Sequence, residues 1–441
     1  MRQAVTALFV SGERVFVIKR QEYLNAFPGY TAFPGGKVDD LESEAHLKIK
    51  FMDKYSPKVM RGLIREIKEE LGYDLKKGIE NGEVISFSHF GNAISPEFNQ
   101  LRFDTHFYKI VLSSAVPFEI DFGEFSEGHW VKPVDLLETF KKGELLMVPP
   151  TLKAVTSLAE DIHFEHTIDL NLSYDRELMV PYISPIYGIT HFLPLSNTFP
   201  PANRTNSFLI GDYLIDPSPK DKEELSKFIY SLKDFKFSGI FLTHHHPDHH
   251  EFSTEIARLR SVPMAMSETT HQMILKKFGD DYFKDIKIMY FKDGDVLTKC
   301  AGKDIYVFEI PGHDGGQLAL APKTMEWFLV GDLIQTVGTV VIGKPEGDMA
   351  KYFSSLKKVI DLNPKIIIPS HGISVGGTFK LKETLKHRKM REEQILDLLK
   401  QGKTKEEMLS VIYKDLDQSL IPYALKTIEC HLEKIQNEKL A

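Results

Sequence analysis

Residues 244–250 constrain what this chain can fold into more strongly than any other stretch. They follow the apolar run SGIFLT and hold five histidines and one aspartate: His244, His245, His246, Asp248, His249 and His250. Burying that many ionisable groups costs free energy unless something binds them. Imidazole and carboxylate are zinc ligands that need no cysteine. The stretch therefore predicts a metal centre at the end of a buried strand.

Three more donors stand at the ends of apolar, strand-like runs. His313 closes DIYVFEIPGH, Asp332 closes MEWFLVGD and His371 closes KIIIPSH. Strand ends on a rigid sheet hold ligands in fixed positions. These residues are predicted to join the same metal centre.

The pattern resembles the metallo-β-lactamase superfamily and its His-x-His-x-Asp-His motif. All seven family ligand positions are filled in order, by His244, His246, Asp248, His249, His313, Asp332 and His371. The resemblance implies two Zn²⁺ ions, the first held by His244, His246 and His313. It assigns the second to Asp248, His249 and His371. Asp332 would bridge the two ions, although iron or manganese can occupy such sites.

The same resemblance implies hydrolysis by a hydroxide that bridges the metals, with Asp248 as a catalytic carboxylate. No Gly-x-Ser-x-Gly nucleophile motif accompanies the metal motif. Asp216, at the end of GDYLIDPSP, is expected to support the site, and Ser218 stands where a glycine is common in the family. His245 and His250 are expected either to support the ligands or to lie exposed.

The segment after His371 resembles the winged-helix tail of the lactamase-β-like-2 branch, including its His-Arg pair, here His387 and Arg388. That branch contains single-strand-directed endoribonucleases, which makes single-stranded RNA a candidate partner. A local basic run could meet phosphates, and its members are Lys382, Lys386, Arg388, Lys389 and Arg391. The alternative is a solvated helix face paired with the interleaved Glu383, Glu392 and Glu393.

A second constellation lies near the N-terminus. Phe33-Pro34-Gly35-Gly36 precedes an amphipathic helix near 59–72, on which Glu66, Glu69 and Glu70 share one face. Carboxylates gathered in this way repel unless a divalent cation joins them, and oxygen ligands suit Mg²⁺ or Mn²⁺.

Arg65 through Tyr73 resembles the second half of the Nudix box, which implies that the three glutamates bind metal and that Glu66 and Glu70 act in catalysis. Glu42 follows Gly36 at the family spacing, but about 15 extra residues separate it from Arg65. Glu124 or Glu127 could supply a further base or ligand. The split box and the downstream sequences RFDTHFY, EFSEGHWV and VPPT look like the branch that contains coenzyme A diphosphatases, although the coenzyme A-specific flanking motif is absent from the sequence. This resemblance implies a nucleoside-diphosphate or coenzyme A-type substrate.

The fold is predicted to be α/β in three parts. A Nudix α/β/α sandwich (1–160) and a linker (161–180) precede a metallo-β-lactamase αββα sandwich (181–375) and a small winged-helix-like tail (376–441). Only Cys300 and Cys430 are present, which excludes a disulfide framework and a thiolate zinc cluster. A cytoplasmic location without membrane attachment is expected, because no apolar run reaches ~18 residues.

Three functions fit these patterns. The first combines a zinc phosphodiesterase acting on RNA with a Nudix pyrophosphohydrolase. The second moves the zinc chemistry to a thioester, such as an acyl-coenzyme A or a glyoxalase-type substrate. In the third, the Nudix domain is a non-catalytic ligand-binding regulator. Net charge of −7 excludes a general polyanion binder but leaves room for a local basic patch.

Overall fold

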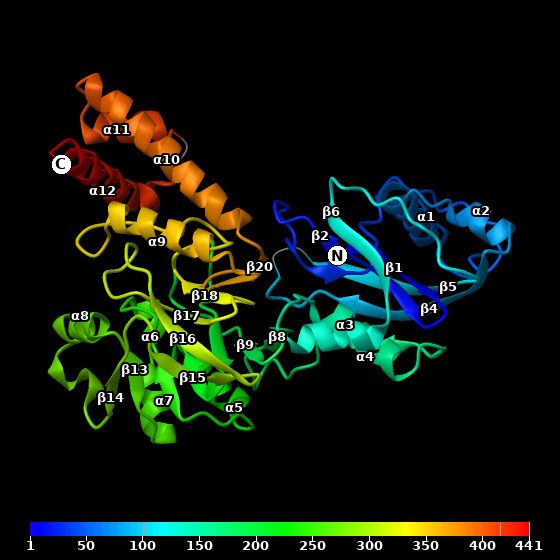
Figure 1. The fold of residues 1–441 in the computed structure, drawn as a ribbon, viewed down its shortest axis with the longest axis horizontal. Helices are drawn as coiled ribbons and strands as arrows, with labels where there is room; N and C mark the ends of the chain where they lie inside the picture. Colours follow the sequence, from blue (N-terminus) through cyan, green and yellow to red (C-terminus); the bar gives the residue numbers. More distant parts are fainter. Residues whose placement is uncertain (100–101, 415, 441) are drawn as a thin grey trace. The chain divides into compact units, whose positions relative to one another are not determined.

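The computed structural model describes residues 1–99, 102–414 and 416–440 (Figure 1). The chain divides into two compact units, Met1–Tyr174 and Asp175–Ala441. Among the described helices, none combines the length and the apolar character that crossing a bilayer requires.

The N-terminal unit is built on one mixed seven-stranded sheet. Its spatial order is β3 (Thr31–Ala32), β2 (Arg14–Arg20), β1 (Arg2–Ser11), β5 (Phe103–Leu112), β4 (Val84–Ile94) and β7 (Ile168–Asp169), with β6 (Phe125–Val131) paired to β2. Alternate side chains of β1 serve two cores: Phe9 packs on one face and Leu8 on the other. Both faces of the sheet are therefore buried.

Helices cover each face, which confirms the predicted α/β/α sandwich. The covering helices are α1 (Pro57–Leu71) and α2 (Leu75–Glu80) on the Phe9 face, and α3 (Pro133–Lys141) and α4 (Pro149–Glu160) on the Leu8 face. Ser56 caps α1, and Gly72 ends it with a left-handed backbone (φ 64°). The helix predicted near 59–72 is therefore present.

Two segments differ from the simple sequence prediction. β7 pairs with β4 inside the predicted linker, so residues up to Tyr174 belong to the N-terminal unit. The extra segment between Glu42 and Arg65 is also integrated, because Ile49 and Met52 are buried in the α1 core. Apolar burial thus holds a stretch that carries no recognisable motif.

The second unit contains two sheets. The first has the order β14 (Ile288–Tyr290), β13 (Met264–Met266), β12 (Gly239–Phe241), β11 (Tyr213–Ile215), β10 (Ser207–Ile210), β9 (Ile189–Phe192) and β8 (Tyr182–Ile186). The second has the order β15 (Val296–Cys300), β16 (Lys303–Glu309), β17 (Leu318–Pro322), β18 (Phe328–Gly331), β19 (Ile366–Pro369) and β20 (Val375–Gly376). Most of these strands are wholly buried, as expected for sheets covered on both faces.

Helices pack against the outside of both sheets and confirm the αββα architecture. The first sheet carries α5 (Lys222–Ser231), α7 (Ser253–Arg260) and α8 (Glu268–Phe278), and the second carries α9 (Met349–Leu362). A short helix, α6 (Pro247–His250), follows β12 and contains part of the histidine-rich stretch.

The described tail is helical. It consists of α10 (Phe379–Lys400), α11 (Lys405–Ile412) and α12 (Ile421–Leu440), joined by a small core. α10 begins against the core of α9, where Leu381 is buried, and its far end packs through Ile395 against α12. One helix therefore links the second sheet to the tail.

His191 on β9 makes folding of the second unit sensitive to acid. Burial lowers the pKa of His191 to about 4, and its Nε2 atom has no hydrogen-bond partner. An unfolded histidine titrates near 6.5, so this stabilisation is complete above that pH and is lost as the pH falls towards 4.

The variant His191→Gln is therefore expected to lose less stability on acidification. Between pH 7 and 4.5 the difference should be about 2 kcal/mol, measured by urea unfolding in the presence of a chelator. Other buried histidines titrate in both proteins, so the comparison isolates His191. An identical pH dependence in the two proteins would contradict the assignment.

Candidate metal centres

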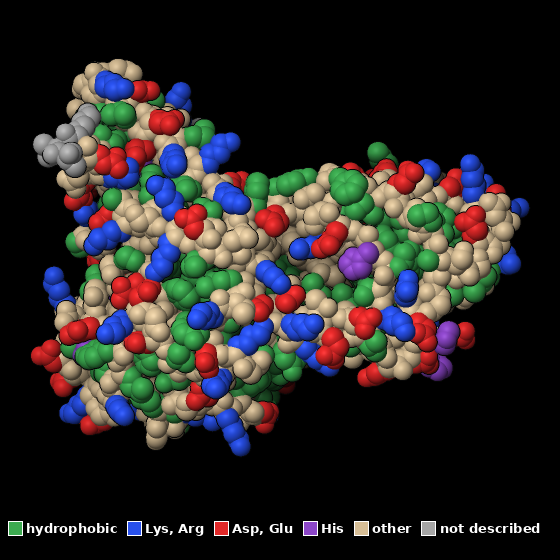
Figure 2. Space-filling view, in the orientation of Figure 1, with side chains coloured by type: hydrophobic (Ala, Val, Ile, Leu, Met, Phe, Trp, Pro, Cys, Tyr) green, Lys and Arg blue, Asp and Glu red, His purple; other side chains and the backbone are tan. Residues whose placement is uncertain are grey.

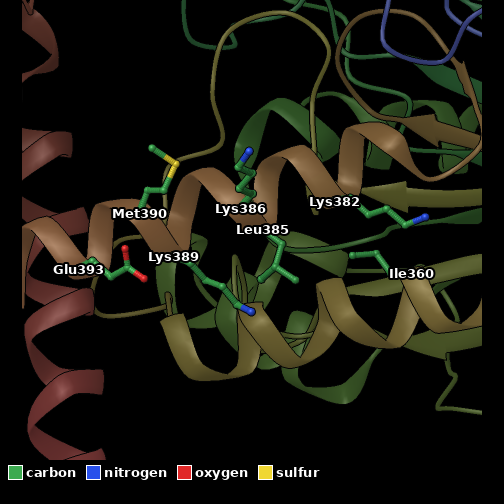
Figure 3. Close-up of a pocket in the computed structure, with 7 residues that line it drawn as sticks. All are labelled: Ile360, Lys382, Leu385, Lys386, Lys389, Met390 and Glu393. Carbon is green, nitrogen blue, oxygen red and sulfur yellow. The ribbon is translucent and has the colours of Figure 1, made fainter.

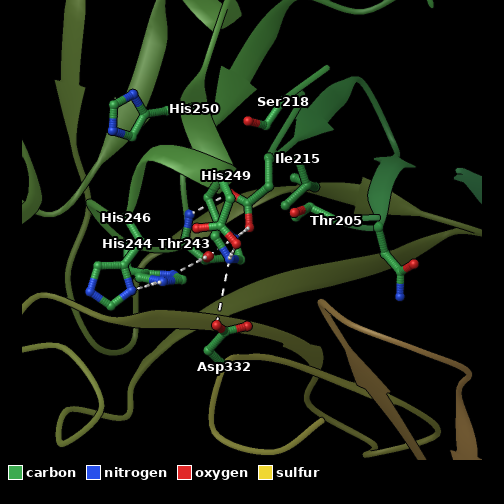
Figure 4. A network of polar contacts seen from close by, with 12 residues as sticks. Thr205, Ile215, Ser218, Thr243, His244, His246, His249, His250 and Asp332 are labelled. Carbon is green, nitrogen blue, oxygen red and sulfur yellow. Dashed lines mark hydrogen bonds and ion pairs between the residues drawn. The ribbon is translucent and has the colours of Figure 1, made fainter. Parts of the chain in front are cut away.

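Three histidine nitrogens meet where β12 and the loop after β16 end. His246 Nδ1 lies 3.0 Å from His244 Nε2 and 2.9 Å from His313 Nε2. Figure 4 shows His244 and His246 turned toward one another near Asp332. With Asp332, these three side chains form a group whose ligand atoms all lie within 4.8 Å of one another.

Each ring has one nitrogen that points away from the group, and the hydrogen bond of that nitrogen fixes the protonation of the nitrogen that points inward. Thr243 Oγ1 donates to Asp216 Oδ2 (2.6 Å), so it accepts a hydrogen bond from His244 Nδ1 (3.0 Å). His313 Nδ1 donates to the Val341 carbonyl (2.8 Å). The Nε2 atoms of His244 and His313, which point into the group, therefore carry lone pairs in place of hydrogens. A shared cation would bind these lone pairs.

A second group adjoins the first. Asp248, His249 and His371 also bring their ligand atoms within 4.8 Å of one another. His249 Nδ1 donates to Asp216 Oδ2 (2.9 Å) and His371 Nδ1 donates to the Arg204 carbonyl (2.9 Å). When these rings are neutral, their Nε2 atoms consequently face the group as acceptors.

Asp332 lies between the two groups. Its Oδ2 is 3.6 Å from both His313 Nε2 and His249 Nε2, and its Oδ1 is 3.4 Å from His371 Nε2. These separations are too long for good hydrogen bonds but suit donors that share a cation. Asp332 Oδ1 and His249 Nε2 are buried without hydrogen-bond partners, so the residues fit a two-metal centre.

The pKa values of histidines in the two groups are shifted in opposite directions. Burial and the neighbouring rings hold the pKa of His244 and of His246 well below its usual range. Burial would also lower the pKa of His249, but Asp332, Asp248 and Asp216 raise it well above its usual value. In the absence of metal, protons would therefore gather in the second, carboxylate-rich group.

Asp216 organises the approach to both groups. It has a left-handed backbone (φ 45°), which aspartate tolerates better than most residues. Ser218, where the family usually has glycine, donates to the Pro247 carbonyl (3.1 Å) and accepts from the Glu251 N–H (3.0 Å). The serine thus fastens both ends of α6.

His245 and His250 are buried, so the exposed alternative is wrong for both. His250 Nδ1 contacts the Tyr282 hydroxyl (2.6 Å), and its Nε2 donates to the His245 carbonyl (3.0 Å). His245 Nδ1 pairs closely with Asp314. Sequence reasoning missed Asp314, although its position directly after His313 was the available signal.

Arg388 does not belong to an exposed basic surface, and this part of the sequence prediction is corrected. Its side chain is buried, hydrogen bonds to the Val340 carbonyl and lies over the Tyr352 ring (5.7 Å). Tyr352 in turn donates to the Leu333 carbonyl (2.7 Å). Leu333 follows Asp332, and Val340 precedes the carbonyl that orients His313.

Replacing Arg388 with Leu is expected to weaken zinc binding about tenfold, because such supporting contacts fix ligand orientation. Chelator competition would measure the affinity, and thermal unfolding would report general damage. The neighbouring His387→Leu serves as control, since His387 is exposed. A lower melting temperature with unchanged zinc affinity would contradict the positioning role.

In the N-terminal unit, Glu70 and Glu66 meet the glycine pair. Glu70 is buried and its Oε2 accepts a hydrogen bond from the Gly35 N–H (2.6 Å). Burial raises the pKa of Glu70 to about 9. A Cβ atom added to Gly36 would lie 2.5 Å from the Glu66 carboxylate, so a side chain at position 36 would force that carboxylate to move from this place.

Arg65 gathers the remaining carboxylates. It bonds to Glu42 (3.0 Å), Glu66 (3.0 Å) and Glu69 (2.8 Å). The inserted segment therefore does not remove Glu42 from the box. Glu69 is exposed and turned toward Arg65, and in the described part of this unit the carboxylates do not form a group with ligand atoms within 4.8 Å.

Of the two further glutamates considered, only Glu124 lies near this centre. Burial is the main cause of the raised pKa of both Glu66 and Glu70, and the charge of Glu124 raises both further. Glu127 is instead 3.7 Å from Lys19.

Comparison with protein families matches three segments of the chain. Residues 1–149 match the NUDIX domain, residues 200–371 the metallo-beta-lactamase superfamily, and residues 404–441 the beta-lactamase associated winged helix domain. These segments contain both candidate centres and the helices α11 and α12, whereas α10 lies between the second and third matched segments.

Similar curated proteins cover the second unit. The chain is 28% identical to the Drosophila melanogaster beta-lactamase-like protein 2 homolog, over 53% of this chain and 82% of that protein. A hydroxyacylglutathione hydrolase of Bdellovibrio bacteriovorus is 27% identical over 34% and 54%, respectively. A crystal structure of a beta-lactamase domain protein from Burkholderia ambifaria shares the fold, with a TM-score of 0.51, 16% identity, and coverage of 60% of this chain and 90% of that one.

Proposed function

Because this chain joins a Nudix domain to a metallo-β-lactamase superfamily domain and its associated winged helix, we propose that it is a hydrolase with two distinct catalytic centres. The observation that carries the proposal is Asp332, which lies within 3.6 Å of histidines from both ligand groups. This arrangement supports a dinuclear centre in the second unit.

Two zinc ions, when bound, would supply the chemistry of an activated water molecule and a polarised scissile bond. His244, His246 and His313 would hold one ion, Asp248, His249 and His371 the other, and Asp332 both. Asp216 keeps His249 in the tautomer that leaves Nε2 free. Asp248 has the more exposed side chain of the two site carboxylates, and we assign it the transfer of a proton from water to the leaving group.

We propose a phosphodiester of single-stranded RNA as the first candidate substrate. Lys382, Lys386 and Lys389 of the predicted basic run are exposed on α10, near the second sheet. A thioester is the second candidate, because one similar protein is named a hydroxyacylglutathione hydrolase.

The decisive experiment is hydrolysis of a short single-stranded RNA by the zinc-loaded chain and by its His246→Ala variant. Cleavage that disappears in the variant would establish the phosphodiesterase. If neither protein cleaves RNA, acyl-coenzyme A is the next substrate, and hydrolysis of it would transfer the function to thioesters.

The N-terminal unit is proposed to hydrolyse a nucleoside diphosphate linked to another group, including coenzyme A-type compounds. Mg²⁺ or Mn²⁺ would neutralise the pyrophosphate, held by Glu66, Glu70 and, once it leaves Arg65, Glu69. The present pairing of Glu69 with Arg65 favours the alternative of a non-catalytic binding domain. Substitution of Glu70 separates these possibilities, as described below.

A further inference from the structure

A groove of about 420 Å³ runs between α9 and α10 in the second unit. Lys382, Lys386 and Lys389 line it from one side of α10, at helix spacings of four and three residues. Figure 3 shows Leu385 and Lys389 turned toward Ile360, while Lys386 extends from the opposite edge of α10. The groove thus combines three ammonium groups with an apolar floor.

Two acidic residues of α10 near these lysines, Glu383 and Glu392, pair with other side chains. Glu383 pairs with Lys380 (2.7 Å), and Glu392 pairs with Lys434 (2.6 Å) and with His431 (3.0 Å). In the described chain, none of the three groove lysines has an acidic partner within 4.0 Å. This side of α10 is solvated, as the alternative prediction expects, but among the described residues its three lysines lack the ion pairs within the helix that the alternative also expects.

Unpaired like charges one helical turn apart repel each other and destabilise the helix. A ligand with several regularly spaced anions would relieve that repulsion. Figure 2 shows Lys and Arg side chains over the region of α9 and α10. Glu393 is the one carboxylate that lines the groove, beside Met390 at its end, so the lysine segment keeps a net positive charge.

The floor favours a ligand that also has flat, weakly polar surfaces. Ile360, Leu385 and Met390 line the groove, and Met390 is half exposed. A flexible methionine adapts to differently shaped partners. Bases of any sequence would find contact there, while the backbone phosphates meet the lysines.

We propose that the α9–α10 groove binds the backbone of single-stranded RNA outside the zinc centre, as an extended substrate site. The inference rests on the proposed phosphodiesterase function. The groove helices contact the metal-bearing loops directly: Tyr352 of α9 bonds to Leu333, and Arg388 of α10 bonds to Val340. An RNA strand in the groove would therefore lie on helices that pack against the loops of the metal centre.

The test compares zinc-loaded full-length proteins binding a fluorescent 20-nucleotide 2′-O-methyl oligouridylate. In the variant Lys382→Gln/Lys386→Gln/Lys389→Gln, the Kd should rise at least tenfold. The slope of log affinity against log salt should become shallower by about 2, because each lost phosphate contact contributes roughly 0.7 on a single strand.

The matched control is Lys380→Gln/Lys400→Gln/Lys403→Gln, which removes the same charge from lysines that already pair with carboxylates. It should bind within twofold of the wild type. Equal losses in both variants, or no loss in the groove variant, would overturn the proposal. Displacement of the oligouridylate by poly-glutamate as effectively as by poly-uridylate would also overturn it, in favour of an acidic peptide partner.

Hydrolysis of bis(p-nitrophenyl) phosphate separates this proposal from the proposed function. This ester carries a single phosphate and is too small to reach the groove, so its hydrolysis by the wild type reports on the metal centre alone. If the wild type binds RNA through the lysines but hydrolyses neither RNA nor this ester, the proposed phosphodiesterase function is refuted. The proposal that the groove binds RNA is then supported, but not its role as a substrate site.

Discussion

Replacing Asp332 with Ala is expected to remove bound zinc and hydrolytic activity together. The carboxylate lies within 3.6 Å of His249, His313 and His371, so its loss leaves both ligand groups without their shared member. Activity should fall more than about a hundredfold, and zinc content from about two ions per chain to fewer than about one. Elemental analysis of the purified variant measures the metal directly.

Glu346→Gln is the appropriate control. Glu346 is a carboxylate near the centre, 4.0 Å from His245, but it belongs to neither ligand group. This variant should keep its zinc. Equal zinc content in Asp332→Ala and the wild type would refute the bridging assignment.

The second large effect is expected for Glu70→Gln, which should reduce pyrophosphate hydrolysis by about a hundredfold or more, as loss of a positioned carboxylate does. The amide oxygen of Gln can still accept the Gly35 hydrogen bond. A panel of nucleoside-diphosphate-linked compounds, including coenzyme A, assayed with Mg²⁺ or Mn²⁺ provides the measurement. Undiminished turnover in the variant would mean that the box is not catalytic.

Stability measurements of Glu70→Gln would test whether unfolding causes the loss of pyrophosphate hydrolysis. Burial raises the pKa of Glu70 to about 9, so its contribution to stability is complete below about 4.5 and is lost as the pH rises towards 9. Without divalent metal, Glu70→Gln should therefore be more stable than the wild type at pH 8. A mutant that is both inactive and less stable under those conditions would point to misfolding.

The clustering of the candidate metal ligands could be predicted from the sequence because it depends on residue types. Histidines and aspartates at strand ends have few structural uses, and the structure brings all seven predicted side chains together. The supporting groups were harder to predict. Arg204 and Val341 act through backbone carbonyls, which any residue type could supply.

Arg388 shows the opposite limit. A basic residue in a charged helix predicts exposure, yet tertiary packing places its guanidinium against Tyr352 and the Val340 carbonyl. Likewise, sequence spacing suggested that the Nudix box was interrupted. Ile49 and Met52 of the extra segment are buried in the core, and Glu42 forms an ion pair with Arg65. No local sequence pattern predicts this pairing.

The crowded contact at Gly36 gives a rule for reading related chains. The carboxylate of Glu66 occupies the space that a side chain at this position would fill. In a relative with alanine or a larger residue there, the glutamate at position 66 would have to place its carboxylate elsewhere. A change at position 36 is therefore expected to alter the arrangement of the box even where every glutamate is kept.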